Sequence, residues 1–339
     1  MSPKNLSVIK KNHKNLKNKL NNNRISRIYQ KFEKKFNLKT NFIVAVSGGP
    51  DSLALAFCAK IYAIKNKLQP KFILVDHKLR SESTKEAKTV KKLLKKYSIN
   101  IEILTWRGKK PSKNISSLAR EKRYELLFKK CDKFKISNIL LGHHQDDLLE
   151  NFFIRVLRGS GLNGLVSLDY KSKVGNKNLL RPLLNENKES LIFLSKKVFN
   201  FYVEDPSNED EKFQRIRIRK LIHNLQNNGL DKKKFLKTIR NLKYSNIAAN
   251  HYVNENLKKN SFFFTKSNRL VLNSVFFEHP HEIVFRALSE GIRLIGKKYY
   301  PARGKKIDNI INSIENNDSF KATLGGCIIE KVNQTVIIS

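Results

Sequence analysis

The chain has 339 residues, enough for two domains, and a hydrophobic fraction of 40%, enough for a buried core. No run approaches the roughly 20 apolar residues of a membrane helix, and the Lys/Asn-rich start lacks the apolar segment of a signal peptide. A cytoplasmic protein without a membrane partner is therefore expected. The formal charge of +39, from 68 basic and 29 acidic residues, favours a polyanion such as nucleic acid as partner, although an A/T-rich genome would also raise the Lys and Asn content.

The first half of the chain predicts an α/β fold. Residues 1–24 are expected to be a solvated basic arm. Short β-rich apolar runs then predict strands at 42–46, 72–76, 99–106 and 136–142. Helices are expected at 53–65, 81–97, 115–134 and 145–158. This alternation is typical of a parallel sheet covered on both faces, in which ligands bind beyond the carboxyl ends of the strands.

The second half is less regular. A strand is expected at 179–184, helices at 188–200 and 213–228, and turns at 205–208 and 301–304. A long helical region to residue 259 is followed by strand-like segments at 262–272 and 325–339, with helices between them. We therefore predict a domain at 25–228 and a smaller, mostly helical α+β domain at 229–339.

Cysteine usage excludes several kinds of site. Cys58, Cys131 and Cys327 are far apart, and none belongs to a C-x-x-C pair. A zinc ribbon, an iron–sulfur cluster or a disulfide scaffold is therefore not expected, and each cysteine is interpreted as a small buried apolar residue.

A glycine-rich turn carries the strongest chemical signal. Ser47-Gly48-Gly49-Pro50-Asp51-Ser52 joins the first strand to the first helix. The two glycines permit a backbone that turns amide groups toward an anion, and the next helix adds its N-terminal dipole, so the turn suits phosphate. It is not a Walker loop, because no lysine ends it. The simpler interpretation is a tight turn in which Asp51 and Ser52 cap a helix.

The order of motifs resembles one family. Ser-Gly-Gly-x-Asp-Ser after a first strand is the signature of PP-loop ATP pyrophosphatases, and residues 42–221 resemble the tRNA(Ile)-lysidine synthase family. The other matching segments are 75–80 (VDHKLR), 119–124 (AREKRY), 142–147 (GHHQDD) with Glu150, 158–161 (RGSG) with Gly164 and Leu165, 181–184 (RPLL), 205–208 (DPSN) and, more weakly, 323–327 (TLGGC). The chain departs from the usual pattern at Leu148, Asn151, 215–219 (RIRIR) and 223–224 (HN).

The resemblance implies a fold and a reaction. The first domain would be a Rossmann-like PP-loop domain of the adenine nucleotide alpha hydrolase type. With ATP and Mg²⁺, the enzyme would adenylate oxygen 2 of the wobble cytidine in a tRNA(Ile) with a CAU anticodon. Free L-lysine would then displace AMP at ring carbon 2, giving lysidine and changing the codon read from AUG to AUA. The arm and the second domain would hold the tRNA mainly through its phosphates. A homodimer is compatible with the sequence, which leaves the oligomeric state open.

The resemblance and the spacing together select the candidate site. The residues assigned to catalysis are Asp51, Arg120, Asp146 and Asp147. Those assigned to ATP are Ser47, Gly48, Gly49, Pro50, Asp51, Ser52, Asp76, His77, Arg80, Gly142 and His143. Those assigned to lysine or tRNA are Arg123, Glu150, Arg158, Arg215, Arg217 and Arg219. Asp51 and Asp147 are the candidate magnesium ligands.

Most of these residues have a second interpretation. Asp146 and Glu150 share a helix face with Asp147 beside them, which suits a cation or simply complements the helix dipole. We interpret His143 and His144 as hydrogen-bonded residues that support the site rather than as metal ligands. Arg120 and Arg123 would bind phosphate or belong to a solvated basic face. Asp76 and Arg80 would contact a nucleoside or form a capped turn. The stretch 215–219 would contact phosphates or pack its isoleucines in the interior.

Two rival functions remain at this point. A PP-loop tRNA thiolase would use the same ATP turn but needs catalytic or cluster-binding cysteines. A non-catalytic RNA-binding protein would keep the nucleotide fold without its chemistry, which the intact acids and turn argue against.

Overall fold

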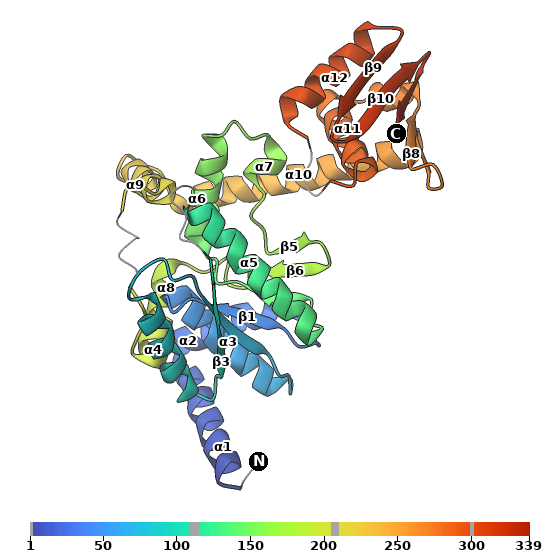
Figure 1. Cartoon of the computed structure of the whole chain (residues 1–339). Coiled ribbons are helices and arrows are strands. Elements are labelled where there is room, and N and C mark those ends of the chain that lie inside the picture. The colour runs from blue at the N-terminus through green and yellow to red at the C-terminus, as the bar shows by residue number, and fades with distance from the viewer. Residues whose placement is uncertain (1–2, 109–114, 205–209, 299–301) are drawn as a thin grey trace. The chain divides into compact units, whose positions relative to one another are not determined.

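The computed structural model describes residues 3–108, 115–204, 210–298 and 302–339 (Figure 1). It divides into two compact units, residues 1–236 and 237–339. The border lies within one helix, α10 (Lys232–Asn260), a few residues beyond the change of sequence character near Gly229. No described helix is long and apolar enough to cross a membrane.

The described residues of the first unit form a six-stranded sheet in the order β3-β2-β1-β4-β6-β5. The strands are β1 (Ile43–Val46), β2 (Lys71–Asp76), β3 (Ile101–Thr105), β4 (Asn138–Leu140), β5 (Lys171–Val174) and β6 (Lys177–Leu180). All neighbours pair in parallel except β5 and β6, an antiparallel hairpin at one edge. The predicted α/β fold with a parallel sheet is confirmed, and β5 is an addition that its polar sequence did not indicate.

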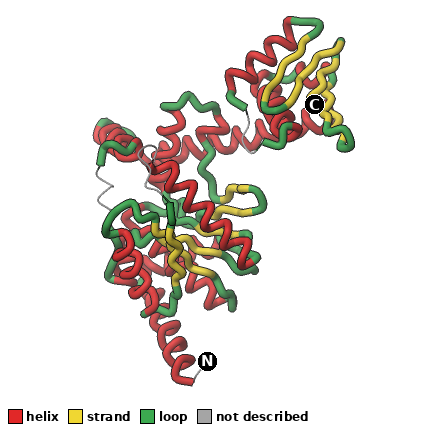
Figure 2. Tube along the Cα trace, viewed as in Figure 1, coloured by secondary structure: helices red, strands yellow, loops and turns green. Residues whose placement is uncertain are grey.

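Alternating side chains of the central strands bury two faces of the sheet. In β1, Val44 packs with the core beneath α3 (Pro50–Lys65), α4 (Ser83–Lys95) and α8 (Lys188–Phe199). Its neighbour Ile43 packs on the opposite face against Leu127 and Cys131 of α5 (Ile115–Phe134). The tube in Figure 2 shows this layering of helices around the yellow strands. Burial on both faces explains why these strands read as continuous apolar runs.

Shorter helices complete the first unit. Helix α2 (Asn23–Lys35) begins at the side chain of Asn22, which accepts from the amides of Arg24 and Ile25. Helix α6 (Gln145–Val156) follows β4, and α7 (Leu162–Leu165) and α9 (Gln214–Asn227) come later in the chain. The predicted turn at 205–208 lies outside the described residues.

The N-terminal segment differs from the solvated arm that was expected. It forms helix α1 (Pro3–Asn18) and a 3₁₀ turn at Lys19–Asn21. Leu16 has no exposed surface and belongs to the main core, and Asn12 donates to the Ser98 hydroxyl at 3.0 Å. The surrounding lysines dominate the composition and conceal this apolar anchor.

The second unit has its own core. Five strands, β7 (Ser261–Phe264), β8 (Arg269–Leu272), β9 (Phe320–Leu324), β10 (Cys327–Val332) and β11 (Thr335–Ile338), pair antiparallel in the order β7-β8-β11-β10-β9. Helices α11 (His281–Ile295) and α12 (Gly304–Asn316) share this core with the sheet, and a 3₁₀ turn lies at Ser274–Phe277. The predicted strand-like segments are each hairpins, because turns at 265–268 and 333–334 divide them.

Candidate active site

Polar segments follow β1, β2 and β4 at the carboxyl edge of the parallel sheet, where the strand order predicts a ligand site. They surround a cavity of about 880 Å³ within the first unit. From the sequence-selected set, its wall contains Ser47, Gly49, Pro50, Asp51, Ser52, Asp76, His77, Arg80, Arg120, Arg123, Gly142, His143, Asp146, Asp147, Glu150, Arg215 and Arg219. The fold therefore brings together residues that are up to 172 positions apart, from Ser47 to Arg219.

The glycine-rich turn has little spare space. Gly48 has φ +93°, and a Cβ there would lie 2.8 Å from a methyl of Val90 and 2.9 Å from one of Val203. Gly142, after β4, lies against the start of α3, since a Cβ would lie 3.1 Å from the carbonyl carbon of Asp51. The positive φ and the two close methyl groups favour glycine at position 48, and the backbone of α3 leaves little room for a side chain at position 142.

The hydroxyl of Ser52 occupies the inside of this turn. It accepts from the amides of Ser47 (3.1 Å) and Gly48 (3.0 Å) and donates to the carbonyl of Gly49 (2.9 Å). These two amides therefore point at Ser52. The sequence had predicted instead that they point at an anion. The first-turn amides of α3, which follow Pro50 and have no partner within the helix, remain as the anion-binding end of the segment.

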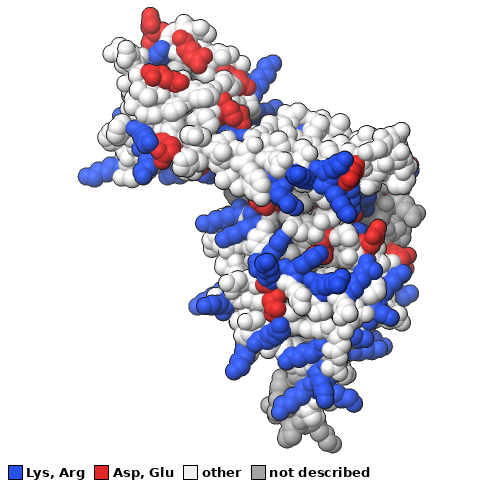
Figure 3. All heavy atoms as spheres, turned by 180° about the vertical axis from the view of Figure 1, so that it is seen from behind, with Lys and Arg blue, Asp and Glu red and all other residues white. Residues whose placement is uncertain are grey.

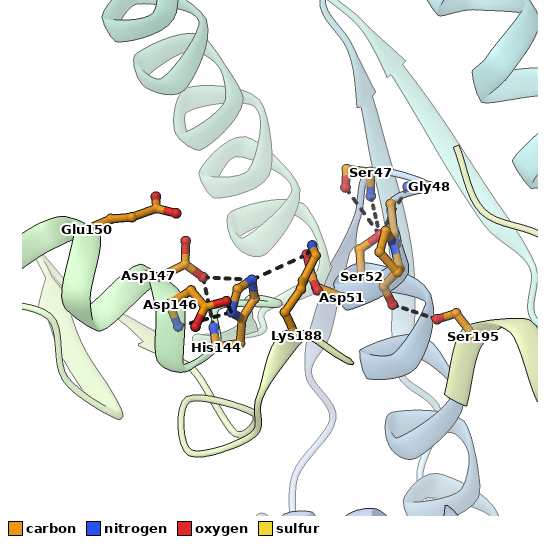
Figure 4. A network of polar contacts seen from close by, with 12 residues as sticks. Ser47, Gly48, Asp51, Ser52, His144, Asp146, Asp147, Glu150, Lys188 and Ser195 are labelled. Carbon is orange, nitrogen blue, oxygen red and sulfur yellow. Dashed lines mark hydrogen bonds and ion pairs between the residues drawn. The ribbon is translucent and has the colours of Figure 1, made fainter. Parts of the chain in front are cut away.

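His144 lies between three carboxylates (Figure 4). Its Nε2 is 3.7 Å from Asp51 and 3.7 Å from Asp147, and its Nδ1 is 3.9 Å from Asp146. It also caps α6, because Nδ1 accepts from the amide of Asp146 at 3.2 Å while its own amide donates to Asp147 at 2.8 Å. Since Nδ1 accepts, the proton of the neutral ring belongs on Nε2, between Asp51 and Asp147. Sequence reasoning noted His144 only as support, and its N-cap position before two acids was the available signal.

The titration of these groups follows their surroundings. Burial raises the pKa of Asp147, but nearby His144 and His143 and the amide of His144 outweigh it, so the pKa lies below its usual value. Burial, aided by Arg181 and Arg120, lowers the pKa of His143 to about 3, so this ring is neutral at physiological pH. Asp147 is therefore a carboxylate held beside two histidine rings, at a position that suits a cation.

Glu150, one turn further along α6, is almost fully buried. One of its oxygens accepts from Nε of Arg219 at 2.5 Å, and the other is buried without a protein partner. Burial raises its pKa although Arg219 opposes this. Asp147 and Glu150 together form an acidic wall in which one oxygen has unused accepting capacity.

Two lysines that the sequence did not single out pair with the acids. Lys188 at the start of α8 donates to Asp51 at 2.6 Å, and Lys232 at the start of α10 pairs with Asp146. Both line the cavity. Lys188 lies 137 positions after Asp51, and no local pattern distinguishes either lysine from the many others.

The arginines fall into two groups. Arg120 and Arg123 of α5 line the cavity and stack over Tyr124, and the buried Nε of Arg123 has no protein partner. Arg215 and Arg219 of α9 also line it, while the intervening isoleucines at 216 and 218 are buried. The packing interpretation of this stretch is therefore confirmed, and its contact with phosphates stays a prediction.

Three selected residues lie elsewhere. Arg158 donates to Gln214 at 3.2 Å, and Arg217 donates to the carbonyls of Glu211 and Lys212 at 2.7 and 3.2 Å. Neither they nor Gly48 are among the described residues of the cavity wall.

Asp76, at the end of β2, shows the turn-capping geometry that the sequence left open. Its oxygens accept from the Lys78 amide (3.0 Å), Ser83 (2.8 Å) and Thr84 (2.7 Å). Burial raises its pKa, but these three hydrogen bonds together outweigh burial, so the pKa lies below its usual value. Arg80 pairs with Glu86 at 2.8 Å. His77 and Arg80 still line the cavity, so this side of the wall combines a fixed turn with exposed polar groups.

A divalent cation has a limited set of protein ligands here. The described residues hold no cluster of three or more His, Cys, Asp or Glu side chains arranged for a metal. One oxygen of Asp51, however, is buried without a partner and lies next to the anion-binding turn. Mg²⁺ is commonly held by one or two carboxylates together with substrate phosphates, so this donor set fits it only in company with a nucleotide.

Comparisons with known proteins agree with this geometry. A family model described as "PP-loop domain" matches residues 19–226. Proteins named tRNA(Ile)-lysidine synthase from Wolbachia pipientis wMel and Orientia tsutsugamushi are 34% and 35% identical to this chain. Each match covers 87% of this chain and 69% and 68% of the respective relative.

A solved structure shares the fold. The U34-tRNA thiolase NcsA from Methanococcus maripaludis, with its [4Fe-4S] cluster, matches with a TM-score of 0.56 and 17% identity, over 65% of this chain and 78% of that one. The three cysteines of the present chain are buried in three separate cores, so they do not form a cluster-binding set. With the turn, the acids on α6 and the similarity over 87% of the chain in agreement, the chain belongs to the tRNA(Ile)-lysidine synthase family of PP-loop proteins.

Proposed function

We propose that this enzyme ligates lysine to ring carbon 2 of the wobble cytidine of tRNA(Ile) with a CAU anticodon, through an adenylated tRNA. One observation carries the proposal. Asp51 of the phosphate turn faces Asp146 and Asp147 of α6 across His144, within a single cavity. An anion-binding helix end and a cation-binding acid cluster are thus neighbours, as a reaction between ATP and an amine requires.

The first step is adenylation. Oxygen 2 of the cytidine attacks the α-phosphorus of ATP, the bond from that phosphorus to the bridging oxygen breaks, and pyrophosphate leaves with the electron pair. Negative charge grows on the phosphoryl oxygens, and fixed positive groups stabilise it. We assign this task to Arg120, which lines the cavity, and Arg123, whose Nε has no protein partner, would support it from the same helix.

The second step is displacement of AMP. The amine of lysine attacks carbon 2, the bond from that carbon to the phosphoryl-bearing oxygen breaks, and the amine loses a proton. Asp147 remains ionised because its pKa is lowered, so it attracts the ammonium form. Glu150 offers a buried oxygen without a partner, and burial raises its pKa, which suits a group that accepts a proton from the amine.

Mg²⁺ would be held by Asp51, with Asp147 as a second carboxylate, together with the phosphates of ATP. When bound, it supplies positive charge that neutralises the triphosphate. The buried, unpartnered oxygen of Asp51 supports this assignment.

The tRNA would bind through its phosphates. Figure 3 shows Lys and Arg side chains spread over the visible face of the first unit, including the N-terminal helix. Arg158 and Arg217 are exposed outside the cavity wall and would contact the tRNA there, with the second unit contributing further contacts. Because its substrates are tRNA and free lysine, we expect the enzyme to act in the cytoplasm. A homodimer stays a prediction, which a measurement of the size of the purified protein would test.

A direct assay tests the function: incorporation of labelled lysine into bulk tRNA with ATP and magnesium present. Signal that depends on both ATP and tRNA is expected, and replacing lysine with a sulfur donor should give no product. Asp51→Ala is expected to retain tRNA binding but to form no lysidine. Normal turnover by that variant would contradict the role of Asp51, and pyrophosphate release without lysine transfer by the wild type would contradict the ligation.

A further inference from the structure

The phosphate turn carries no positive charge of its own. Residues 47–52 contain no Lys or Arg, whereas a Walker loop ends in a lysine that reaches the β- and γ-phosphates. The amides of Ser47 and Gly48 are also directed at Ser52. A triphosphate bound here would need a cation from another part of the fold.

Lys188 is a cation that contacts this turn directly. Its Nζ donates to Asp51 at 2.6 Å, and its side chain, about 36% exposed, lines the cavity (Figure 4). It occupies the first position of α8, directly after the N-cap Asn187, whose side chain accepts from the amide of Ser190 at 2.8 Å. The ammonium group therefore lies beside the residue that follows Gly48-Gly49-Pro50.

The helix that bears Lys188 is fastened to the same turn. The hydroxyl of Ser195, which has no exposed surface, donates to the carbonyl of Pro50 at 2.6 Å. Leu191 and Leu194 of α8 are fully buried in the core that α3 shares. The backbone of α8 is thus fixed relative to the turn, and only the flexible stem of Lys188 is free to redirect its charge.

We propose that Lys188 is the missing lysine of the phosphate turn, supplied by α8. Without nucleotide it neutralises Asp51, and with ATP its Nζ moves to oxygens of the β- and γ-phosphates. When the bond between the α-phosphorus and the bridging oxygen breaks, the electron pair leaves with pyrophosphate, and the protonated amine stabilises that charge without transferring a proton. This assignment rests on the proposed function, since it names a further phosphate-binding residue of the same site.

The alternative is that Lys188 serves only as a counterion of Asp51. The two roles differ in which ligands they affect. A phosphate contact should weaken ATP and pyrophosphate but leave AMP unchanged, because AMP lacks the β- and γ-phosphates. A counterion role should depend on the presence of the Asp51 carboxylate.

Calorimetric titration of the full-length protein with ATP, pyrophosphate and AMP, with magnesium chloride present, separates these roles. Lys188→Ala is expected to weaken ATP and pyrophosphate by about tenfold to a hundredfold, as for loss of a charge-assisted hydrogen bond, and AMP by less than about twofold. Lys188→Arg should recover part of the loss. Lys197→Ala is the matched control, since it removes the same charge from an exposed position on the same helix.

A second background completes the test. If Lys188 contacts phosphate, Lys188→Ala should still weaken ATP in an Asp51→Asn protein, and no further loss there would overturn the proposal. Equal weakening of ATP and AMP would overturn it too. Lys188→Gln, which keeps the stem, replaces the alanine variant if thermal unfolding shows a damaged fold. These are binding measurements, so a wild type that binds ATP but incorporates no lysine would reject the proposed function without deciding the role of Lys188.

Discussion

His144 performs two tasks that substitution can separate. It caps α6, and its Nε2 lies midway between the carboxylates of Asp51 and Asp147. His144→Ala removes both contributions. His144→Asn keeps a side chain that is a strong N-cap, but it is too short to reach between the two acids.

The two effects have different magnitudes. Loss of the cap in the alanine variant should lower the free energy of unfolding by about 1 kcal/mol, and the asparagine variant should recover most of that. The contacts of Nε2 are 3.7 Å long, beyond ordinary hydrogen-bond length, so each is a modest electrostatic interaction. Without the ring, two carboxylates face each other across the cavity. We expect lysidine formation to fall about tenfold in both variants, equivalent to about 1.4 kcal/mol of transition-state stabilisation.

Urea unfolding and the initial rate of labelled lysine incorporation should be measured on the same preparations. The expected pattern is recovered stability with unrecovered activity in His144→Asn. If the asparagine variant turns over at the wild-type rate, the imidazole between the acids has no catalytic importance and only the cap matters. If neither variant changes stability, the capping interaction itself is wrongly assigned.

Two further predictions concern groups outside this pair. His143 is buried and its pKa is about 3, so below about pH 6.5 the unfolded chain binds a proton at this residue that the folded chain does not bind. The contribution of His143 to the free energy of unfolding is therefore complete above about pH 6.5. It is lost as the pH falls, by up to about 1.4 kcal/mol per pH unit. Urea midpoints at pH 7 and pH 5 should therefore converge in His143→Asn, and an unchanged pH dependence would show that this histidine is not the titrating group. Leu16→Ala should cost about 2 kcal/mol or more in thermal unfolding because Leu16 is fully buried, whereas an effect within about 0.5 kcal/mol would restore the interpretation of the N-terminus as a solvated arm.

Much of the fold could be predicted because the central strands are buried on both faces. The strands predicted at 42–46 and 72–76 are easy to recognise, because in a chain this rich in lysine a continuous apolar run indicates a buried strand. Elements with a weaker apolar signal were missed for the same physical reason. Among the described side chains of helix α1, the buried Leu16 lies between exposed lysines. Strand β5 has alternating exposed and half-buried residues and pairs only at the edge of the sheet.

The candidate site shows a similar division. The sequence by itself predicted that a glycine turn, the pair Asp76-His77 and the segment 142–147 with its acids follow strand ends, because local spacing and strand order place them at one edge of a parallel sheet. Only the tertiary structure decided which groups neutralise them. The fold brings Lys188 to Asp51, Lys232 to Asp146, and His144 between Asp51 and Asp147. It also directs the Ser52 hydroxyl toward the inside of the glycine turn. The residues next to a lysine in the sequence do not indicate its partner. The acid that a long, flexible lysine side chain contacts depends on how helices far apart in the chain pack, and only the folded molecule shows this packing.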